Sequence, residues 1–600
     1  MSWRTRFEMV ERVTTSELPT FATGDPVLKS LGTSTARSTR GSTRRASTHI
    51  DPALRLVHWL SLAVAFVLLL YIDRNTWFFA DEMDFLNRII GPQTASTWLL
   101  PHNEHWSTVP LAIYTVLFKF AGMRTYWPYV VVLLLFHLTL VHQIWRLMIR
   151  IGVAGVIATV AAAILAVLGA GIENLNSPFQ ISFTLSLIFS VWAVFVADTR
   201  SRWSFKRLSA IWLLALLSLA SSGIGLAMLL CVCLVAGGRR GWRALVATAS
   251  VPALSYVLWY AYYGRKGVIS ADRVTGEKIL HVPSYAWTGL TNALQSSTGL
   301  PKSGAILVVA LGCYAIFRLR SVRGPALPAF AMFASALFVF FFIGIAREQF
   351  GSSQAESTRY VYISMMLLTP MIGLGFSELC QRWKIASALV AALAGFALVH
   401  NVQLLNSSTS SDSPHYELMQ PFHMDLLGAA HLVQTRAKFV GVGVPQLGYP
   451  PTLSNMPLVP ISSVVSWVDQ GDLAANRQTP LGLLAAETYL QVSVENRPVF
   501  EPIVAPTKVV SPKGATVQGS CVRVSPGNAE IFRVTSRASL PVLGLNRSKA
   551  YLWLLSSAGL TGPALQLQSG DGSSFLNVSR VGDFRLANIS GSPISVCGIS

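Results

Sequence analysis

Three carboxylates lie close together in the segment ADEMDF, which follows the first long apolar run of the chain. They belong to Asp81, Glu82 and Asp84. Ionised groups beside hydrocarbon are costly, so carboxylates at a membrane boundary usually do chemistry or bind a charged group. Asp81, Glu82 and Asp84 are therefore candidate catalytic residues.

A second polar segment, PHNEHW, follows these carboxylates and contributes His102, Glu104 and His105. The imidazole nitrogens can add hydrogen-bond donors for a bound anion. The carboxylate of Glu104 can join Asp81 in holding a divalent cation, because hard cations prefer oxygen ligands. The residue types alone do not decide whether a metal is needed.

The composition indicates the class of protein that carries these groups. Of the 600 residues, 52% are hydrophobic and only 12% are charged, and apolar stretches near the ~20 residues that cross a bilayer recur along the chain. The net charge of +19 would suit nucleic acid in a soluble protein. Here the Lys and Arg residues fall largely in short loops between apolar runs, where they set orientation. The sequence therefore predicts a polytopic α-helical membrane protein and excludes nucleic acid as a partner.

The chain divides into three predicted parts. Residues 1–50 are rich in Ser, Thr and Arg and predict a disordered cytoplasmic tail. Residues 51–401 carry the apolar spans, with an external loop at 73–127, and residues 402–600 predict an extracytoplasmic domain. The predicted spans lie near residues 54–72, 128–146, 153–171, 179–197, 208–236, 244–262, 303–317, 326–346, 361–378 and 385–401.

The number of spans depends on how two stretches of the chain cross the membrane. The stretch 208–236 has basic residues on both sides, so both of its ends should face the cytoplasm. A hairpin that breaks at Ser221-Ser222-Gly223 satisfies this, since Gly and Ser permit a sharp turn where protein surrounds it. The stretch 107–121 is short for a span and carries Lys119, which favours an interfacial helix. About eleven spans follow, with the N-terminus inside and the C-terminus outside.

This topology brings the polar loops to one external face, including the segment 263–302 as a loop. Arg347 and Arg359 flank the last large loop and are candidates for phosphate binding, because a guanidinium binds phosphate oxygens in a bidentate fork. Polar residues of a further loop are expected to line the same cavity, since carboxylate and amide groups suit ligand hydroxyls. They are Glu173, Asn174 and Gln180.

From about residue 402 long apolar runs vanish and turn residues become frequent. An amphipathic helix is predicted near 416–436. The segments TVQGSCVRVS, AEIFRVTS and AYLWLLSS predict short strands, which favours a β-sandwich or jelly roll. Cys521 and Cys597 are the two cysteines of this domain, and exported domains lie in an oxidising compartment, so we expect a disulfide between them.

The order of these features resembles the C-type (GT-C) membrane glycosyltransferases, in particular the group of the lipid A aminoarabinose transferase and the protein mannosyltransferases. In that group an acidic pair in the first external loop is followed by a Pro-Leu helix beside the membrane, which ends in a Phe-Gly-like turn. The corresponding residues here are Asp81-Glu82, Pro110-Leu111 and Phe120-Ala121-Gly122. The motifs cover residues 54–200. The chain departs from the pattern in one respect, because its His-containing segment does not directly precede Pro-Leu, which leaves the roles of the two histidines open.

The resemblance implies an inverting glycosyltransferase in a bacterial-type cytoplasmic membrane. Such enzymes take a sugar from a polyprenyl phosphate at the outer leaflet and pass it to a cell-envelope glycan, lipid or protein. They need a carboxylate base, cations for the leaving phosphate and a groove for membrane lipid. The resemblance thus implies that Asp81 is the base or the acceptor-orienting residue and that Glu82 or Asp84 supports it. Trp98 or Trp106 can offer an apolar face to the sugar. Some members carry a carbohydrate-binding module where this chain has its C-terminal domain.

Each candidate also has a structural interpretation. Asp81 and Glu82 can cap an interfacial helix through its first amide groups. The two arginines can snorkel at helix ends or pair with Glu348 and Glu356. The two histidines can be ordinary buried or interfacial side chains.

A second class of function stays open as well. A non-catalytic transporter or envelope assembly factor with a glycan-binding exported domain would have a similar composition. A transporter should place paired ionisable groups or broken helices near the bilayer midplane of related halves. This chain collects its charges at the external face and has no internal repeat, which favours the enzyme.

Overall fold

The structure is a computed structural model, and part of the chain lies outside what it describes. The predicted tail is outside it except for Ile50. The described residues are 50–199, 203–267, 276–319, 324–347, 351–408, 414–439, 446–447, 459–474, 476, 478–495, 498, 507–511, 515–518, 520–544, 550–556, 560–561, 565–567, 574–579, 581–589 and 592–597.

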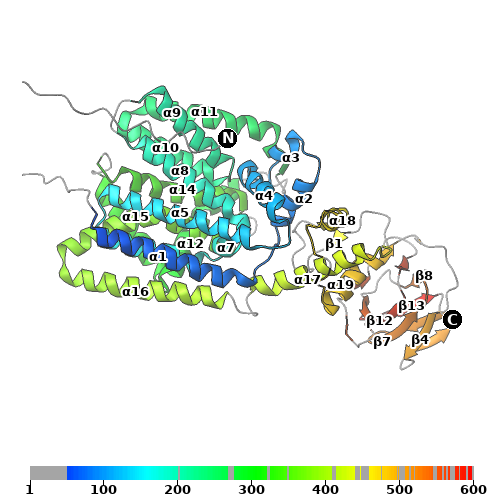
Figure 1. Ribbon diagram of the computed structural model, residues 1–600. Helices are drawn as coiled ribbons and strands as arrows, with labels where there is room; N and C mark the ends of the chain where they lie inside the picture. The colour runs from blue at the N-terminus through cyan, green and yellow to red at the C-terminus, as the bar shows by residue number, and fades with distance from the viewer. Residues whose placement is uncertain are drawn as a thin grey trace, which may run out of the picture. The chain divides into compact units, whose positions relative to one another are not determined.

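Every predicted span forms a helix, and these helices make a bundle in which α1, α5, α15 and α16 run side by side (Figure 1). By length and composition, seven helices of the described chain can cross a membrane. They are α1 (Pro52–Ile72), α5 (Trp127–Ile151), α8 (Ile181–Ala197), α11 (Trp242–Tyr262), α14 (Leu327–Arg347), α15 (Thr358–Arg382) and α16 (Lys384–Ser407). The other predicted spans are shorter helices, namely α6 (Gly155–Ala166), α9 (Phe205–Leu219), α10 (Ile224–Arg240) and α13 (Gly304–Arg318). The chain is a polytopic helical membrane protein.

The predicted hairpin forms between α9 and α10, because α9 ends at Leu219 and α10 begins at Ile224. The Ser218 hydroxyl lies 2.9 Å from that of Ser186 and accepts a 2.7 Å hydrogen bond from Ser190, both on α8. The serines of the turn itself are fully buried. Protein therefore surrounds the break, as non-helical backbone in a membrane protein requires.

The first polar loop folds into three short helices, α2 (Glu82–Ile90), α3 (Ala95–Leu99) and α4 (Thr108–Ala121). Helix α4 corresponds to the predicted interfacial helix. It buries Leu111, Tyr114 and Phe118, whose spacing of three or four residues puts them on one side, while Phe120 is 81% exposed. One side of α4 thus packs on the protein and the other presents an apolar residue outward.

The segment 263–302 is not the loop that the sequence predicts. It contains α12 (Gly276–Thr298), which packs against α13, α14 and α15 and buries Val282, Tyr285 and Ala293. Pro283 and several polar residues interrupt the apolar pattern of this segment, so its helical period is weak in the sequence. Packing by neighbouring helices supplies the stability that local propensity does not.

The C-terminal part begins with three helices, α17 (Pro414–Gln434), α18 (Ile461–Asp469) and α19 (Pro480–Gln491). Only the first corresponds to a helix predicted from the sequence. Met419 and Phe422 of α17 and Trp467 of α18 are buried in the same apolar core as the bundle helices. These helices therefore extend the packing of the bundle.

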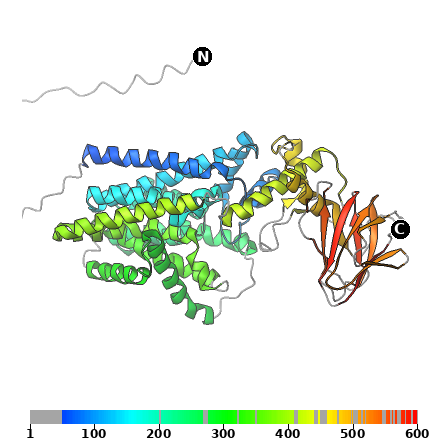
Figure 2. The ribbon, with the colours of Figure 1, turned by 90° about the horizontal axis from the view of Figure 1, so that it is seen from below.

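The last hundred residues form two antiparallel sheets that face each other, seen edge-on in Figure 2. One sheet has the strand order β10-β9-β12-β7-β4 and the other β3-β11-β8-β13-β6-β5. Inward-pointing residues of both sheets, such as Phe532, Phe584 and Leu540, form a separate core. The strands are β3 (Val492–Glu495), β4 (Thr507–Ser511), β5 (Ala515–Gln518), β6 (Cys521–Val524), β7 (Ala529–Val534), β8 (Ala538–Leu543), β9 (Ala550–Leu555), β10 (Leu565–Leu567), β11 (Ser574–Val578), β12 (Gly582–Asn588) and β13 (Ile594–Cys597).

A disulfide joins Cys521 and Cys597, the two cysteines paired on the basis of the sequence. The two residues lie opposite each other on the neighbouring strands β6 and β13. The bond joins β6 to β13, the last described strand, across a sequence separation of 76 residues. A closure of this length removes much conformational freedom from the unfolded chain.

The residues that follow α4 contact the turn that follows α18. The amide of Met123 donates to the carbonyl of Asp472 over 2.9 Å. Gly122, which ends α4, has a φ of 57°, and a Cβ there would lie 2.5 Å from the Asp472 carboxylate. Only glycine satisfies both demands, since other residues are strained at positive φ and add a colliding atom.

We expect Gly122→Ala to lower the stability of the folded protein by about 2–4 kcal/mol, from backbone strain plus the contact with Asp472. Thermal unfolding in detergent measures the loss. Gly152→Ala is the matched control, because Gly152 also has a positive φ of 99° but no atom lies within 4 Å of its Cβ position. Equal losses for the two variants would contradict the close approach of Asp472.

Candidate active site

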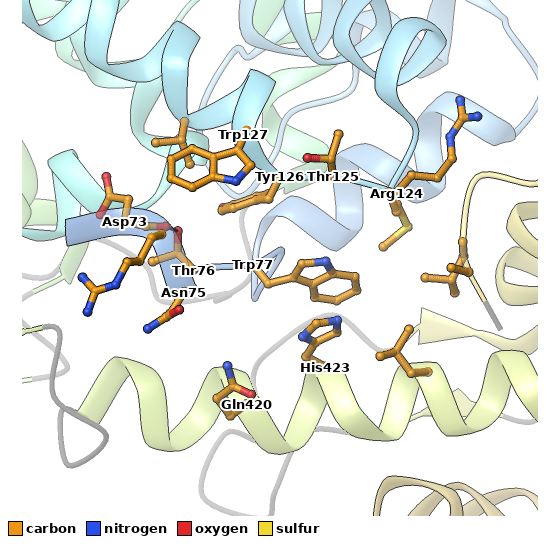
Figure 3. A pocket seen from close by; sticks show the side chains of 16 residues that line it. Asp73, Asn75, Thr76, Trp77, Arg124, Thr125, Tyr126, Trp127, Gln420 and His423 are labelled. Atoms are coloured by element: carbon orange, nitrogen blue, oxygen red, sulfur yellow. Dashed lines mark hydrogen bonds between the residues drawn. The ribbon is translucent and has the colours of Figure 1, made fainter. Parts of the chain in front are cut away.

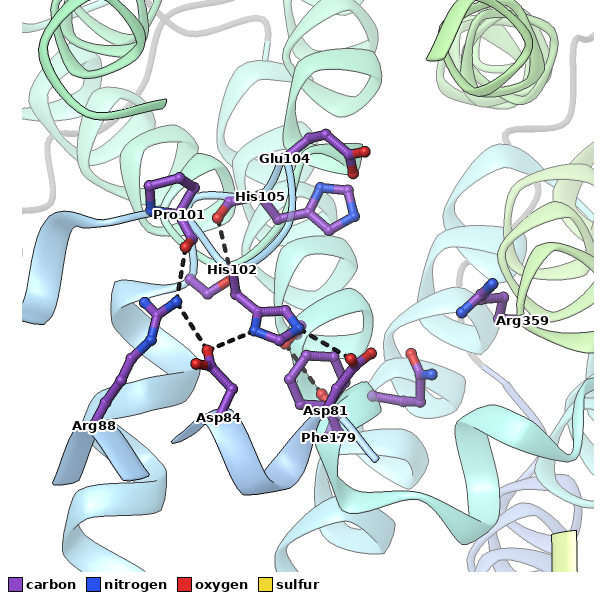
Figure 4. Close-up of polar contacts among 12 residues, drawn as sticks. Asp81, Asp84, Arg88, Pro101, His102, Glu104, His105, Phe179 and Arg359 are labelled. Atoms are coloured by element: carbon purple, nitrogen blue, oxygen red, sulfur yellow. Dashed lines mark hydrogen bonds and ion pairs between the residues drawn. The ribbon is translucent and has the colours of Figure 1, made fainter. Parts of the chain in front are cut away.

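Asp81 and Asp84 lie on either side of the imidazole of His102 (Figure 4). Helix α2 begins at this point, so its first turn places residues three apart on one side. His102 Nδ1 lies 2.7 Å from Asp84 Oδ2, and His102 Nε2 lies 3.3 Å from Asp81 Oδ1. The three residues therefore form one charged cluster, which we call the acidic–histidine cluster.

A tight turn in the backbone fixes the position of His102. The amide of His102 donates to the carbonyl of His105 over 3.0 Å, and the amide of His105 donates back over 2.9 Å. Asn103, within this turn, has a φ of 50°, a conformation that asparagine tolerates better than most residues. The ring of Phe179 packs 4.9 Å from the His102 ring. The backbone turn and the ring of Phe179 together fix the position of the imidazole.

Arg88 supports the cluster from the next turn of α2, and the sequence analysis did not single it out. Its guanidinium lies 2.8 Å from Asp84 Oδ2 and also donates to the carbonyls of Leu100 and Pro101. It therefore ties α2 to the segment that carries His102. The spacing of four residues between Asp84 and Arg88 is the signal that could have indicated the pair.

The electrostatics of the cluster favour the charged forms of its own three residues. Burial alone would lower the pKa of His102, but its hydrogen bonds and proximity to Asp81 and Asp84 raise that pKa to about 9. Burial would likewise raise the pKa of each aspartate, yet the neighbouring His102 holds both below the ordinary value. At neutral pH the cluster is two carboxylates around one imidazolium.

Asp81 is the carboxylate of the cluster that a ligand can best reach. Its side chain is 34% exposed, and its ion pair with His102 uses one oxygen. Asp84 instead shares its oxygen Oδ2 between His102 and Arg88. Although Asp81 precedes the first residue of α2, its side chain makes no capping hydrogen bond with that helix. The exposed carboxylate of Asp81 can therefore accept a proton or orient a hydroxyl group.

Glu82 points away from the cluster and is only 1% exposed. Its carboxylate accepts hydrogen bonds from the hydroxyls of Tyr114, at 2.5 Å, and Tyr126, at 2.8 Å, and from the amide of Phe79, at 3.0 Å. Burial raises the pKa of Glu82 to about 7, against the opposing effect of these three donors. Glu82 thus links α2 to α4 and to the start of α5.

Two arginines near the cluster are each held by a carboxylate. Arg347 pairs with Glu104 at 2.9 Å, and Arg359 pairs with Glu173 at 3.2 Å. The electrostatic influence of Arg359 reaches Asp81, where it helps to lower the pKa. Figure 4 shows the guanidinium of Arg359 across from the Asp81 carboxylate. The partners shown for both arginines therefore come from distant loops. Of the two alternatives considered from the sequence, Glu348 lies outside the described residues, and no ion pair of Glu356 occurs within the described chain.

Several polar atoms beside Arg359 lack a partner within the described chain. Its Nε is buried and unpaired, although its Nη1 bonds Glu173. Both amide atoms of Asn174 are unpaired although the residue is fully buried, and Gln180 uses only its Nε2, which donates to Glu173. Glu173 and Asn174 lie in α7 (Glu173–Asn176). Buried groups of this kind are costly unless a ligand or water satisfies them.

His105 lies at the tip of the α9–α10 hairpin rather than in the cluster. A Cβ on Gly223 would fall 2.8 Å from its Nδ1, so the glycine makes room for the ring. Burial lowers the pKa of His105 to about 4, and Glu104 opposes this effect. His105 is therefore neutral at pH 7. The hairpin tip and the first loop meet here, as the amide of Val109 also donates to the carbonyl of Ala220.

The carboxylates do not assemble into a metal site. Within the described residues no group of three or more His, Cys, Asp or Glu side chains lies close enough to hold one ion. Asp81 binds His102 and Glu104 binds Arg347, so each of the two carboxylates considered as ligands has a cationic partner. A divalent cation would have to displace these partners, and the residues present do not fit it.

No protein-family model and no curated protein sequence matches the chain. Its fold has a likeness to the cryo-EM structure of arabinosyltransferase EmbB from Mycobacterium smegmatis, with a TM-score of 0.33 and 12% sequence identity. The alignment covers 93% of this chain and 65% of that one.

The raised pKa of His102 makes stability depend on pH. Its charged form stabilises the fold fully below pH 6.5, and this contribution disappears as the pH rises through about 9. Glu82 titrates near 7 and adds no slope well above that value. Between pH 7 and 9 we therefore expect the wild-type protein to lose about 2 kcal/mol of stability.

Thermal unfolding across this pH range checks the expectation, with His102→Gln as the comparison. The variant keeps a hydrogen-bonding side chain but cannot titrate, so its unfolding temperature should change less with pH. A wild-type slope that His102→Gln retains in full would assign the titration to another group.

Proposed function

We propose that this chain is a membrane glycosyltransferase, which takes a sugar from a polyprenyl-phosphate-linked donor and passes it to a cell-envelope acceptor. The acceptor is a glycan, a lipid or a protein. The observation that carries the proposal is the pairing of two features: the ionised, partly exposed carboxylate of Asp81, and a nearby arginine, Arg359, whose buried Nε has no hydrogen-bond partner among the described residues. A base and an anion site at one place are what sugar transfer from a phosphate requires.

In this mechanism Asp81 acts on the acceptor. A hydroxyl oxygen of the acceptor attacks the anomeric carbon of the sugar, and its proton passes to the Asp81 carboxylate. The bond between that carbon and the phosphate oxygen breaks, and its electron pair leaves with the polyprenyl phosphate. Attack from the face opposite the leaving group inverts the anomeric centre. His102 keeps Asp81 ionised and oriented, since its charge favours the carboxylate form.

Arg359 and Arg347 act on the leaving phosphate. The unpaired Nε of Arg359 is a donor available to a phosphate oxygen, and Glu173 fixes the guanidinium through Nη1. Arg347, held by Glu104, supplies a second positive charge. Donors that are fixed before the reaction stabilise developing negative charge without reorganisation. The unpaired amide of Asn174 is suited to a sugar hydroxyl.

The setting follows from the orientation that the basic loops predict. We assign residues 1–50 to a cytoplasmic tail, 51–401 to the transmembrane domain and 402–600 to an extracytoplasmic domain of a bacterial-type cytoplasmic membrane. The cluster then faces the outer leaflet, where a polyprenyl phosphate can lie beside apolar helices such as α4. The tip of the α9–α10 hairpin at His105 lies against the same loop and is a candidate contact for the lipid.

Asp81→Asn should reduce sugar transfer by about 10²–10⁴-fold, because the amide cannot accept a proton. The measurement is transfer of labelled sugar from polyprenyl-phosphate donors by the purified protein. Asp583→Asn is the matched control, since it makes the same chemical change in the sandwich, where Asp583 pairs with Arg533. Transfer that persists in the folded Asp81→Asn variant would remove Asp81 from the mechanism, and no transfer by wild type with any donor would favour the non-catalytic class.

Arg359→Lys should lower kcat/KM for the donor by roughly tenfold or more, because lysine keeps the charge but loses the fork that binds two phosphate oxygens. Initial rates at varied donor concentration measure this. Arg533→Lys, at an exposed ion pair in the sandwich, controls for the substitution itself. A donor kcat/KM that is unchanged in Arg359→Lys would mean that Arg359 serves only its ion pair with Glu173.

A further inference from the structure

A cavity of about 310 Å³ lies between the first loop and α17, apart from the acidic–histidine cluster (Figure 3). Four segments line it: the turn that follows α1, the residues that join α4 to α5 with the start of α5, the side of α17 that faces them, and the residues after α18. A cavity of this size is at the lower end of those that bind small organic ligands in proteins.

Asp73 is the residue of this cavity whose side chain lacks hydrogen-bond partners within the described chain. Its side chain belongs to a residue only 3% exposed, and neither carboxylate oxygen has a hydrogen-bond partner in the described chain. The turn after α1 uses the backbone carbonyl of Asp73, which accepts from the amide and hydroxyl of Thr76, and leaves the carboxylate unused. Two buried acceptors without donors are expensive, so a bound molecule with hydroxyl groups would satisfy them.

Aromatic rings supply a second kind of surface in the same cavity. The indole of Trp77 stacks on the ring of His423, with centroids 3.8 Å apart and planes within 13°. The amide of Trp77 also lies 3.0 Å from the sulfur of Met419, so this side chain is anchored to α17. Trp127 at the start of α5 is 43% exposed and also lines the cavity. Indole faces suit the C–H face of a sugar ring.

The remaining polar groups agree with a sugar rather than a phosphate. Gln420 offers an amide that can both donate to and accept from hydroxyls. Arg124 is exposed, and Arg74 already donates to the carbonyl of Tyr71 and lies over its ring. Burial raises the pKa of Asp73, and a carboxyl group in either protonation state offers a phosphate no positive charge, whereas its oxygens can accept from sugar hydroxyls.

We propose that this cavity binds one sugar ring of a glycan, with hydroxyls donating to Asp73 and the ring lying against Trp77 or Trp127. Trp77 and Asp81 are four residues apart, a distance of at most about 14 Å even in a fully extended chain. The cavity and the acidic–histidine cluster are therefore close enough for one short glycan to span both. Its role as the docking site for the acceptor rests on the proposed function, but sugar binding by itself does not.

Binding can be tested on the purified full-length protein without any transfer assay. The probes are methyl glycosides of common pentoses and hexoses, with inorganic phosphate for comparison, and the readouts are tryptophan fluorescence and thermal stabilisation. At least one glycoside should bind wild type, and Asp73→Asn should weaken that binding by about tenfold or more, because the substitution replaces one oxygen of the carboxyl group with an NH₂ group that cannot accept a hydrogen bond. Phosphate should give no saturable signal.

Further variants separate this site from the catalytic one. Trp127→Ala changes an exposed side chain, so this variant should fold and still bind the glycoside more weakly. It therefore tests the cavity even if Asp73→Asn does not fold. Asp81→Asn should bind the glycoside as wild type does even where it abolishes transfer. The inference is overturned if no glycoside binds wild type, if binding survives both cavity variants, or if phosphate alone binds. Transfer activity in any of these cases would leave the proposed function standing.

Discussion

The arrangement of the first loop depends on the buried carboxylate of Glu82. It accepts from Tyr114 of α4, from Tyr126 just before α5 and from the amide of Phe79. These contacts fix the start of α2, and with it the nearby residues Asp81 and Asp84. Asp81 lies one residue before Glu82 and Asp84 two residues after it, so a rotation of this one turn would move both carboxylates away from His102. The structural carboxylate therefore lies within two residues of the candidate catalytic ones, and burial separates their roles.

The charges of the site are balanced locally, which explains how they persist at the end of an apolar bundle. His102 stands between two aspartates, and each arginine has its own glutamate. Pairing lowers the cost of burying each charge, although it seldom adds much net stability. Among the buried atoms that lack a hydrogen-bond partner within the described chain are the Nε of Arg359 and both amide atoms of Asn174. Such leftover groups indicate where a ligand makes its contacts better than the paired charges do.

The sequence was sufficient for the parts of the fold that depend on local pattern. The spans, the hairpin break and the strand segments of the sandwich follow from apolar period, flanking charge and turn residues. Helix α12 was missed because Pro283 and polar residues hide its period, and tertiary packing decides it. The acidic segment was recognised as a candidate site, but its internal division was not, since nothing in the letters DE distinguishes an exposed aspartate from a buried glutamate. Only the positions of Tyr114 and Tyr126 make that distinction.

The same loop connects two chemically different places. Its first residues line a cavity with an unpaired carboxylate at Asp73, and its later residues carry an ionised carboxylate at Asp81. The buried rings of Phe78 and Phe79 lie between them and pack against Tyr126, Tyr129 and Phe422. A loop anchored on both faces in this way cannot shift at one place without shifting at the other. Because α17 closes the cavity through His423, the C-terminal part of the chain shares in positioning the first loop, and the two cannot be understood as independent modules.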